Sequence, residues 1–196
     1  MNTSSPAVSE APPVAGSQEP LSAPTRCVTL RLTPGQHTAL RRTAHAFMLA
    51  CAHAHQVGLE HHTTGNAAIH RQCYYDLRAA YGLPANLAVR AIARAARRLK
   101  AAAPAPGEVG TTLYIEYDCR VFSLCPISKT VSLASLDGRL TDIPVDAEGD
   151  VRLRLGPPMP TRAVLYMTPS QVSTLVLEYP TPHRSPQDAS RQDVDA

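Results

Sequence analysis

Residues 27–34 read CVTLRLTP, and this stretch decides the fold because a strand ends and a helix begins within it. CVTLRL alternates apolar and polar side chains and contains β-branched residues, which predicts a short strand. Thr33 followed by Pro34 is typical of a helix start, with threonine as the N-cap and proline at the first helical position. A single strand is therefore expected to lead directly into a helical block.

Three helices are predicted after this strand. Apolar residues recur at three- and four-residue spacing over roughly 34–60, which indicates one long amphipathic helix. Asn66 is expected to cap a second helix that runs to about Tyr81 and stops at Gly82. Pro84 opens a third helix, PANLAVRAIARAARRLK, whose apolar side contains leucine, isoleucine and alanine.

From residue 111 onward the pattern predicts strands. The β-type runs are 113–118, 119–124, 130–136, 139–145, 150–155, 162–167 and 173–179, and Asp137-Gly138 predicts a two-residue hairpin turn. One strand, three helices and then six or seven strands predict an α+β fold. We expect a small β-barrel built from 26–33 and 108–180, with the helical segment 34–107 inserted after its first strand.

Composition limits the class of protein. The 196 residues suit one domain of ordinary size or two small modules, and the flanks 1–25 and 181–196, rich in Pro, Ser and acidic residues, are predicted to be disordered. No long apolar run or signal peptide is visible, and the five cysteines contain no CxxC pair. These features predict a soluble cytoplasmic protein with reduced cysteines and no membrane partner.

Positive charge is concentrated between the flanks. The whole chain carries a formal charge of +3, but residues 26–179 contain 17 basic and 11 acidic side chains, a net of +6. Arginine accounts for 17 of the 19 bases. A guanidinium group pairs with phosphate and stacks on bases, so the bias fits nucleic-acid binding. A GC-rich genome, which also favours arginine and alanine, is an alternative explanation that stays open.

The sequence offers little for catalysis or metal binding. Acids are sparse before residue 137, and no nucleophile motif or phosphate loop is present, so the chain is expected not to be an enzyme. Seven histidines lie between residues 37 and 70, but Cys51 with His55, and His70 with Cys73, each form only half a metal site. No metal or cofactor is predicted, although structural zinc remains an alternative.

The third helix gives the clearest binding signal. Arg90, Arg94 and Arg97 recur at i, i+4 and i+7 opposite an apolar face, so one side can pack while the other meets a polyanion. A solvated basic helix without a partner is the alternative. The preceding helix adds Tyr74, Tyr75, Arg78 and Tyr81 as stacking and hydrogen-bonding groups, and at least one of these tyrosines is expected in the core.

Several segments together resemble the N-terminal half of TnpB (OrfB) proteins, transposon-encoded RNA-guided nucleases related to type V CRISPR effectors. The segments are TLRLTPGQHTALRRTAHAF, CYYDLRAAYGLPANLAVRAIARAARRLK, YDCRVFSL, VSLASLDGRL and LVLEYP, and they cover about 26–180. The resemblance implies that the barrel is an oligonucleotide-binding-type wedge domain that holds guide RNA. It also implies that the helices form a recognition domain, which holds the guide–target heteroduplex and reads a short DNA motif.

Family members continue into a RuvC nuclease with a zinc ribbon, and no D-x-G motif of that nuclease occurs here. We therefore expect a nuclease-less protein whose partners are guide RNA, target DNA and a separate RuvC-bearing subunit or a second copy. Its expected location is the prokaryotic cytoplasm, on the nucleoid when bound to DNA. A stand-alone RNA-guided binder or repressor, and a transposon-remnant interaction module without nucleic acid, are the alternatives.

The resemblance also implies roles for single residues. Asn86 is expected to read an adenine of the motif with its amide, unless it only caps or solvates its helix. The residues expected at the DNA motif and heteroduplex are Tyr74, Arg78, Asn86, Arg90, Arg94 and Arg97. Those expected at the guide RNA are Arg98, Lys100, Arg120, Lys129, Arg152 and Arg154.

Overall fold

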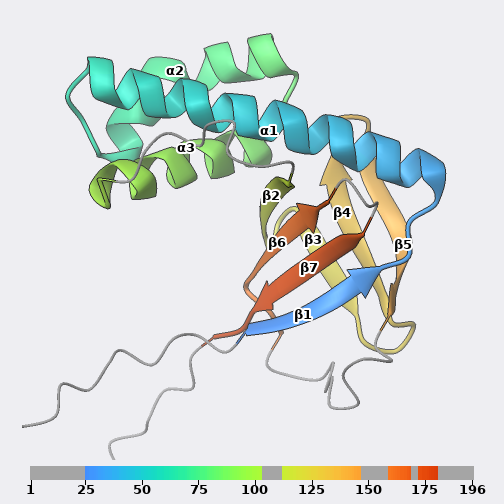
Figure 1. Ribbon diagram of the computed structural model, residues 1–196. Helices are drawn as coiled ribbons and strands as arrows, with labels where there is room; N and C mark the ends of the chain where they lie inside the picture. Colours follow the sequence, from blue (N-terminus) through green and yellow to red (C-terminus); the bar gives the residue numbers. More distant parts are fainter. Residues whose placement is uncertain (1–24, 103–111, 147–158, 169–171, 181–196) are drawn as a thin grey trace, which may run out of the picture.

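Figure 1 shows the computed structural model, which describes residues 25–102, 112–146, 159–168 and 172–180. In this part of the chain, one strand is followed by three helices and six strands, which confirms the predicted mixed α+β organisation. The elements are β1 (Thr25–Leu30), α1 (Pro34–Glu60), α2 (Asn66–Tyr81), α3 (Ala85–Lys100), β2 (Leu113–Asp118), β3 (Phe122–Cys125), β4 (Thr130–Ser135), β5 (Gly138–Asp146), β6 (Arg162–Met167) and β7 (Ser173–Glu178).

The strands form a single curled, antiparallel sheet in the order β2-β6-β7-β1-β5-β4-β3 (Figure 1). The first strand lies at the centre, because β1 pairs with β7 along Thr25–Thr29 and with β5 at Thr29 and Leu30. The two edge strands, β2 and β3, are consecutive in the chain. The curled antiparallel sheet agrees with the predicted barrel only in outline, so the oligonucleotide-binding-type barrel stays a prediction.

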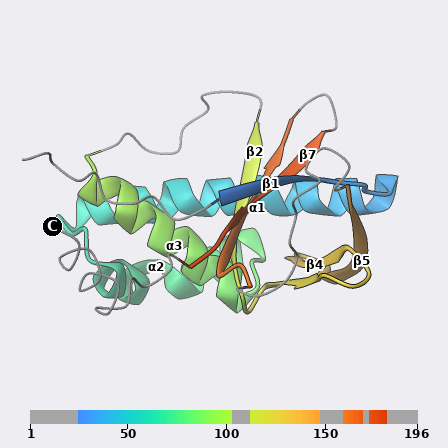
Figure 2. The ribbon, with the colours of Figure 1, turned by 90° about the horizontal axis from the view of Figure 1, so that it is seen from below.

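The long helix α1 connects the sheet to the other two helices (Figures 1 and 2). Thr33 and Gln36 form the predicted start as a capping box, in which each side chain accepts a hydrogen bond from the other residue's backbone N–H. Toward this end, the Thr43 hydroxyl accepts a hydrogen bond from the backbone N–H of Leu136, at 3.0 Å. The C-terminal half of α1 packs on α2 and α3, so α1 spans both layers of the molecule.

Helices and sheet share a continuous hydrophobic core. The buried cluster includes Phe47 on α1, Ile92 on α3 and Leu133 on β4. Tyr117 on β2 is fully buried within it and donates a hydrogen bond to the carbonyl of Ala134, at 3.1 Å. No helix of the described residues is apolar over enough of its length to cross a membrane.

Several local predictions need correction. Asn66 is the first residue of α2, and Gly65 occupies the N-cap without a side-chain hydrogen bond. The hairpin loop between β4 and β5 consists of Leu136 and Asp137, since Ser135 pairs with Gly138. Gly138 has a φ of 111°, a conformation that glycine adopts without strain, and this explains a glycine directly after the loop.

Two predicted strand boundaries also differ from those in the structure. β1 begins two residues earlier than predicted, and residues 119–121 form a turn ahead of β3. The predicted strand 150–155 and the predicted disordered flanks lie outside the described residues, except for Thr25, which is the first residue of β1.

Candidate nucleic-acid interface

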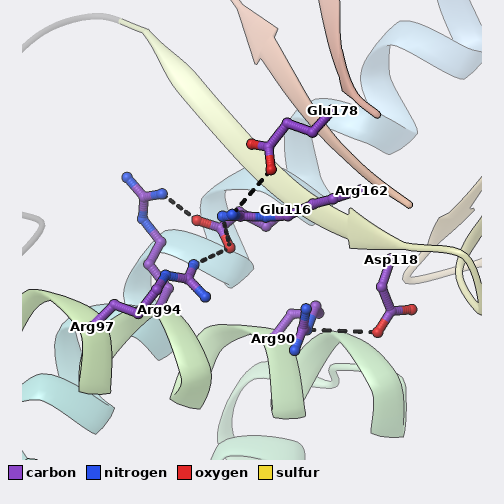
Figure 3. A network of polar contacts seen from close by, with 7 residues as sticks. All are labelled: Arg90, Arg94, Arg97, Glu116, Asp118, Arg162 and Glu178. Atoms are coloured by element: carbon purple, nitrogen blue, oxygen red, sulfur yellow. Dashed lines mark hydrogen bonds and ion pairs between the residues drawn. The ribbon is translucent and has the colours of Figure 1, made fainter. Parts of the chain in front are cut away.

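One buried carboxylate holds three arginines where α3 meets the sheet (Figure 3). Glu116 on β2 is fully buried. One of its oxygens accepts a hydrogen bond from Arg94 on α3, and the other binds Arg97 on α3 and, at 2.9 Å, Arg162 on β6. Arg162 also pairs with Glu178 on β7, at 3.2 Å. The network therefore ties the last helix to three strands.

Burial and ion pairing have opposite effects on the pKa of Glu116. Desolvation alone would raise the pKa of Glu116, but the hydrogen bond from Arg94 and the charges of Arg97 and Arg162 bring it below its ordinary value. Desolvation likewise favours a lower pKa for Arg94, and Glu116 raises it above the usual range. The guanidinium of Arg94 also lies 4.1 Å from the ring centre of Tyr114, a cation–π contact. Both partners of the central pair thus stay charged.

The predicted arginine row of α3 faces β2. Arg90 adds an ion pair with Asp118, at 3.7 Å, one turn ahead of Arg94. Arg97 is the most accessible of the three, with 45% of its side chain exposed, against 22% for Arg90 and for Arg94. The pattern of α3 alone did not indicate these protein partners. Contact between this row and nucleic acid stays a prediction.

Three aromatic rings and a guanidinium group lie close together on the outer face of α2. The rings of His70 and Tyr74 stack with centres 4.5 Å apart and planes 17° apart, and the Arg78 guanidinium lies 5.8 Å from the Tyr74 ring centre. Tyr75 meets the edge of Tyr74 with centres 5.2 Å apart, and 79% of Tyr75 is exposed. None of the helix's tyrosines is fully buried, since Tyr74 and Tyr81 only border the core.

Asn86 lies exposed in the first turn of α3. Pro84 occupies the N-cap position, and no side chain caps this helix. Capping therefore does not explain the asparagine, an exposed residue whose amide group has both a donor and an acceptor.

The structure does not gather the residues predicted at the guide RNA into one place. Arg98 and Lys100 lie in the last turn of α3, about 12 and 15 Å along the helix from Arg90 at a rise of about 1.5 Å per residue. Arg120 lies in the turn after Asp118, the partner of Arg90, and not at the last turn of α3. The remaining predicted residues are Lys129, exposed before β4, and Arg152 and Arg154, which lie outside the described residues.

Three of the four side chains in the possible metal half-sites are buried in the packed core. Cys73 is buried and donates to the carbonyl of Ile69, and burial raises the pKa of the Cys51 thiol. His55 is also buried, with neither ring nitrogen hydrogen-bonded. Across the described ranges, no three His, Cys, Asp or Glu side chains are grouped so that they would hold a metal ion.

Comparison with models of protein families and with curated proteins found no match to the chain. The resemblance to TnpB proteins therefore stays an expectation based on the quoted motifs.

Proposed function

We propose that this protein binds structured RNA and, together with it, a DNA site next to a short motif, as the binding half of a TnpB-like RNA-guided effector. The observation that carries the proposal is the separation of charge between the two layers. The helical segment 34–102 contains nine Arg or Lys residues and two acids, a net of +7. The other described residues contain six of each and are neutral.

Some of these cations pair with acids of the sheet layer, and several others are exposed. Arg42 pairs with Asp137, and Arg90, Arg94 and Arg97 pair with the acids of β2. Within the part of the chain that the structure describes, no carboxylate pairs with Arg71, Arg78 or Lys100, which are all exposed. These cations are available to neutralise phosphates and to release counterions, which is the main source of affinity for nucleic acid.

The exposed Asn86 amide supports the DNA part of the proposal. An asparagine can form paired hydrogen bonds with the N6 and N7 atoms of adenine in the major groove. Asn86 lies next to the corner between α2 and α3, near the end of α2 that follows Tyr75 and Arg78. A helix start of this kind, beside a positively charged surface, fits the reading of one base within a contact made mostly to backbone.

In this proposal the chain supplies binding, and a separate RuvC-bearing subunit or a second copy supplies any cleavage. Without such a partner, the same complex would act as an RNA-guided DNA binder or repressor. The two forms differ in one observable: only the first changes from binding to cutting when the partner is added to the RNA-loaded protein.

The test begins with purification of the protein from cells that also transcribe the DNA around its gene. RNA of discrete size should co-purify, seen as excess absorbance at 260 nm and identified by sequencing. Electrophoretic mobility shift with this RNA should give an affinity that falls steeply with salt. Protein that elutes without nucleic acid and binds none at low salt would contradict the proposal and favour a protein-interaction module.

Variants locate the interface. Arg71→Gln with Arg78→Gln should lower RNA affinity and reduce the slope of log affinity against log salt by about two, one for each lost phosphate contact. Arg31→Gln is the control, because it removes one exposed guanidinium of the neutral layer, directly after β1, where Arg31 pairs with Asp146. An equal effect of the control would show that the helical layer has no special part in binding.

A further inference from the structure

The outer face of α2 contains an arrangement that general electrostatic attraction does not explain. We call His70, Tyr74, Tyr75 and Arg78 the α2 ring cluster. His70, Tyr74 and Arg78 follow one another at four-residue spacing and form a ladder of imidazole, phenol and guanidinium groups. Tyr75 stands beside the ladder, with its ring at 73° to that of Tyr74.

The cluster lies on a firmly anchored helix. Ile69, Cys73 and Leu77 are buried and hold the opposite side of α2 against the core. A rigid support of this kind keeps the rings in place before any ligand arrives, which lowers the entropy lost on binding.

Along α2, Tyr75 has an arginine one turn before it and a small residue one turn after it. Arg71 lies one turn before it, and Ala79, which has no side chain beyond Cβ, lies one turn after it. At about 100° per residue, Arg71 and Arg78 project between Tyr74 and Tyr75 and away from the core, whereas Asp76 lies about 100° from Tyr75.

A single exposed apolar side chain is common and needs no ligand. Here Tyr75, which is 79% exposed, lies within one helical turn of Arg71 and Arg78, and neither arginine is paired with a carboxylate in the described part of the chain. A flat π-surface flanked by cations matches a ligand that is planar and joined to phosphates. An unpaired nucleobase in a single strand has this chemistry, and every base offers such a face.

We propose that the α2 ring cluster is a stacking site for an unpaired nucleobase, with Tyr75 against the base and Arg71 and Arg78 at the neighbouring phosphates. The proposal rests on the proposed function and adds to it the class of ligand, a single-stranded rather than a duplex segment. Bases inside a duplex are already stacked on each other, so they offer no free face on which the Tyr75 ring could stack.

The test measures binding of a short labelled oligouridylate, its single-stranded DNA counterpart and the matching duplex by fluorescence anisotropy. Tyr75→Ala should weaken single-strand binding about tenfold and leave duplex binding unchanged. The salt slope should stay the same, because no charge is removed, whereas Arg78→Gln should lower it by about one. Tyr75→Phe should retain the affinity of the parent. Comparing the RNA and DNA strands shows which one supplies the base.

The matched control is Tyr166→Ala, which removes a tyrosine that is 38% exposed on β6. The stacking site is wrong if Tyr75→Ala binds the single strand as the parent does, if it loses as much affinity for the duplex, or if Tyr166→Ala has the same effect. When such a result accompanies intact binding of co-purified RNA by the parent, the proposed function stands without the stacking site. A parent that binds no nucleic acid overturns both.

Discussion

The guanidinium group of Arg94 on α3 binds the buried carboxylate of Glu116 on β2, so the last helix is fastened to an edge strand of the sheet. Both side chains come from segments that are near in sequence, on either side of residues 103–111. Since Glu116 also serves Arg97 and Arg162, it is the acceptor on which three cations depend. Its removal should therefore affect more than one contact.

Glu116→Gln should lower the free energy of unfolding by about 3 kcal/mol or more, because it leaves the guanidinium groups of Arg94 and Arg97 without their counter-ion. Urea unfolding followed by circular dichroism measures the loss. Asp137→Asn is the control, since its partner Arg42 is 61% exposed and surface pairs contribute about 1 kcal/mol or less. Equal losses in the two variants would show that burial adds nothing to the Glu116 network.

The Glu116 carboxylate should also make the free energy of unfolding depend on pH in the acidic range. Its pKa is lowered in the folded protein from about 4.3 in the unfolded chain, so its contribution is complete above that pH. As the pH falls below about 4.3 toward the folded-state pKa, the unfolded chain binds the proton first and stability is lost. Unfolding free energies from pH 7 down to pH 3 should fall more steeply for the parent than for Glu116→Gln. Glu60→Gln, which changes an exposed α1 residue hydrogen-bonded to Gln56, should keep the parent's profile.

Two glycines of α1 should respond in opposite ways to alanine. A Cβ on Gly58 would lie 2.3 Å from the Leu99 side chain and 3.0 Å from the Thr63 carbonyl, whereas a Cβ on Gly35 would have nothing within 4 Å. Gly58→Ala should destabilise by about 1–3 kcal/mol through overpacking. Gly35→Ala should stabilise by up to about 1 kcal/mol, since alanine favours helix. Melting temperatures of the two variants test this, and a stabilising Gly58→Ala would show that α1 and α3 do not approach so closely.

The five thiols should separate into two classes toward iodoacetamide. Cys27, Cys119 and Cys125 are exposed, whereas Cys51 and Cys73 are buried, and burial raises the pKa of Cys73 to about 11. Peptide mass spectrometry at neutral pH should find the exposed three modified first. Hydrogen bonds from Ser128 lower the pKa of Cys125, which should react fastest and slow down in Ser128→Ala. Modification of Cys51 at the rate of Cys119 would contradict the burial of α1's inner face.

The local parts of the fold were predictable, and the pairings between distant segments were not. Thr33-Pro34 and the apolar spacing predicted α1 to its ends, because caps and periodicity are properties of neighbouring residues. The place of β1 between β7 and β5 depends on residues about 115 to 150 positions away, and no pattern near β1 encodes it. Likewise, the arginines of α3 suggested a free polar face until β2 was placed beside them. One signal was present: the glutamate in the middle of the apolar run LYIEYD.

The central position of β1 has a consequence for the order of folding. Its longer pairing is with β7, where Thr25 lies opposite Glu178, while its pairing with β5 covers only Thr29 and Leu30. A growing chain can complete α1, α2 and α3 early, since their contacts are local, but the middle of the sheet waits for the last strand. Until then β1 and β6 each lack their neighbour β7. Folding intermediates should therefore contain formed helices beside an open sheet, and a link between residues 25 and 178 should speed the closing step.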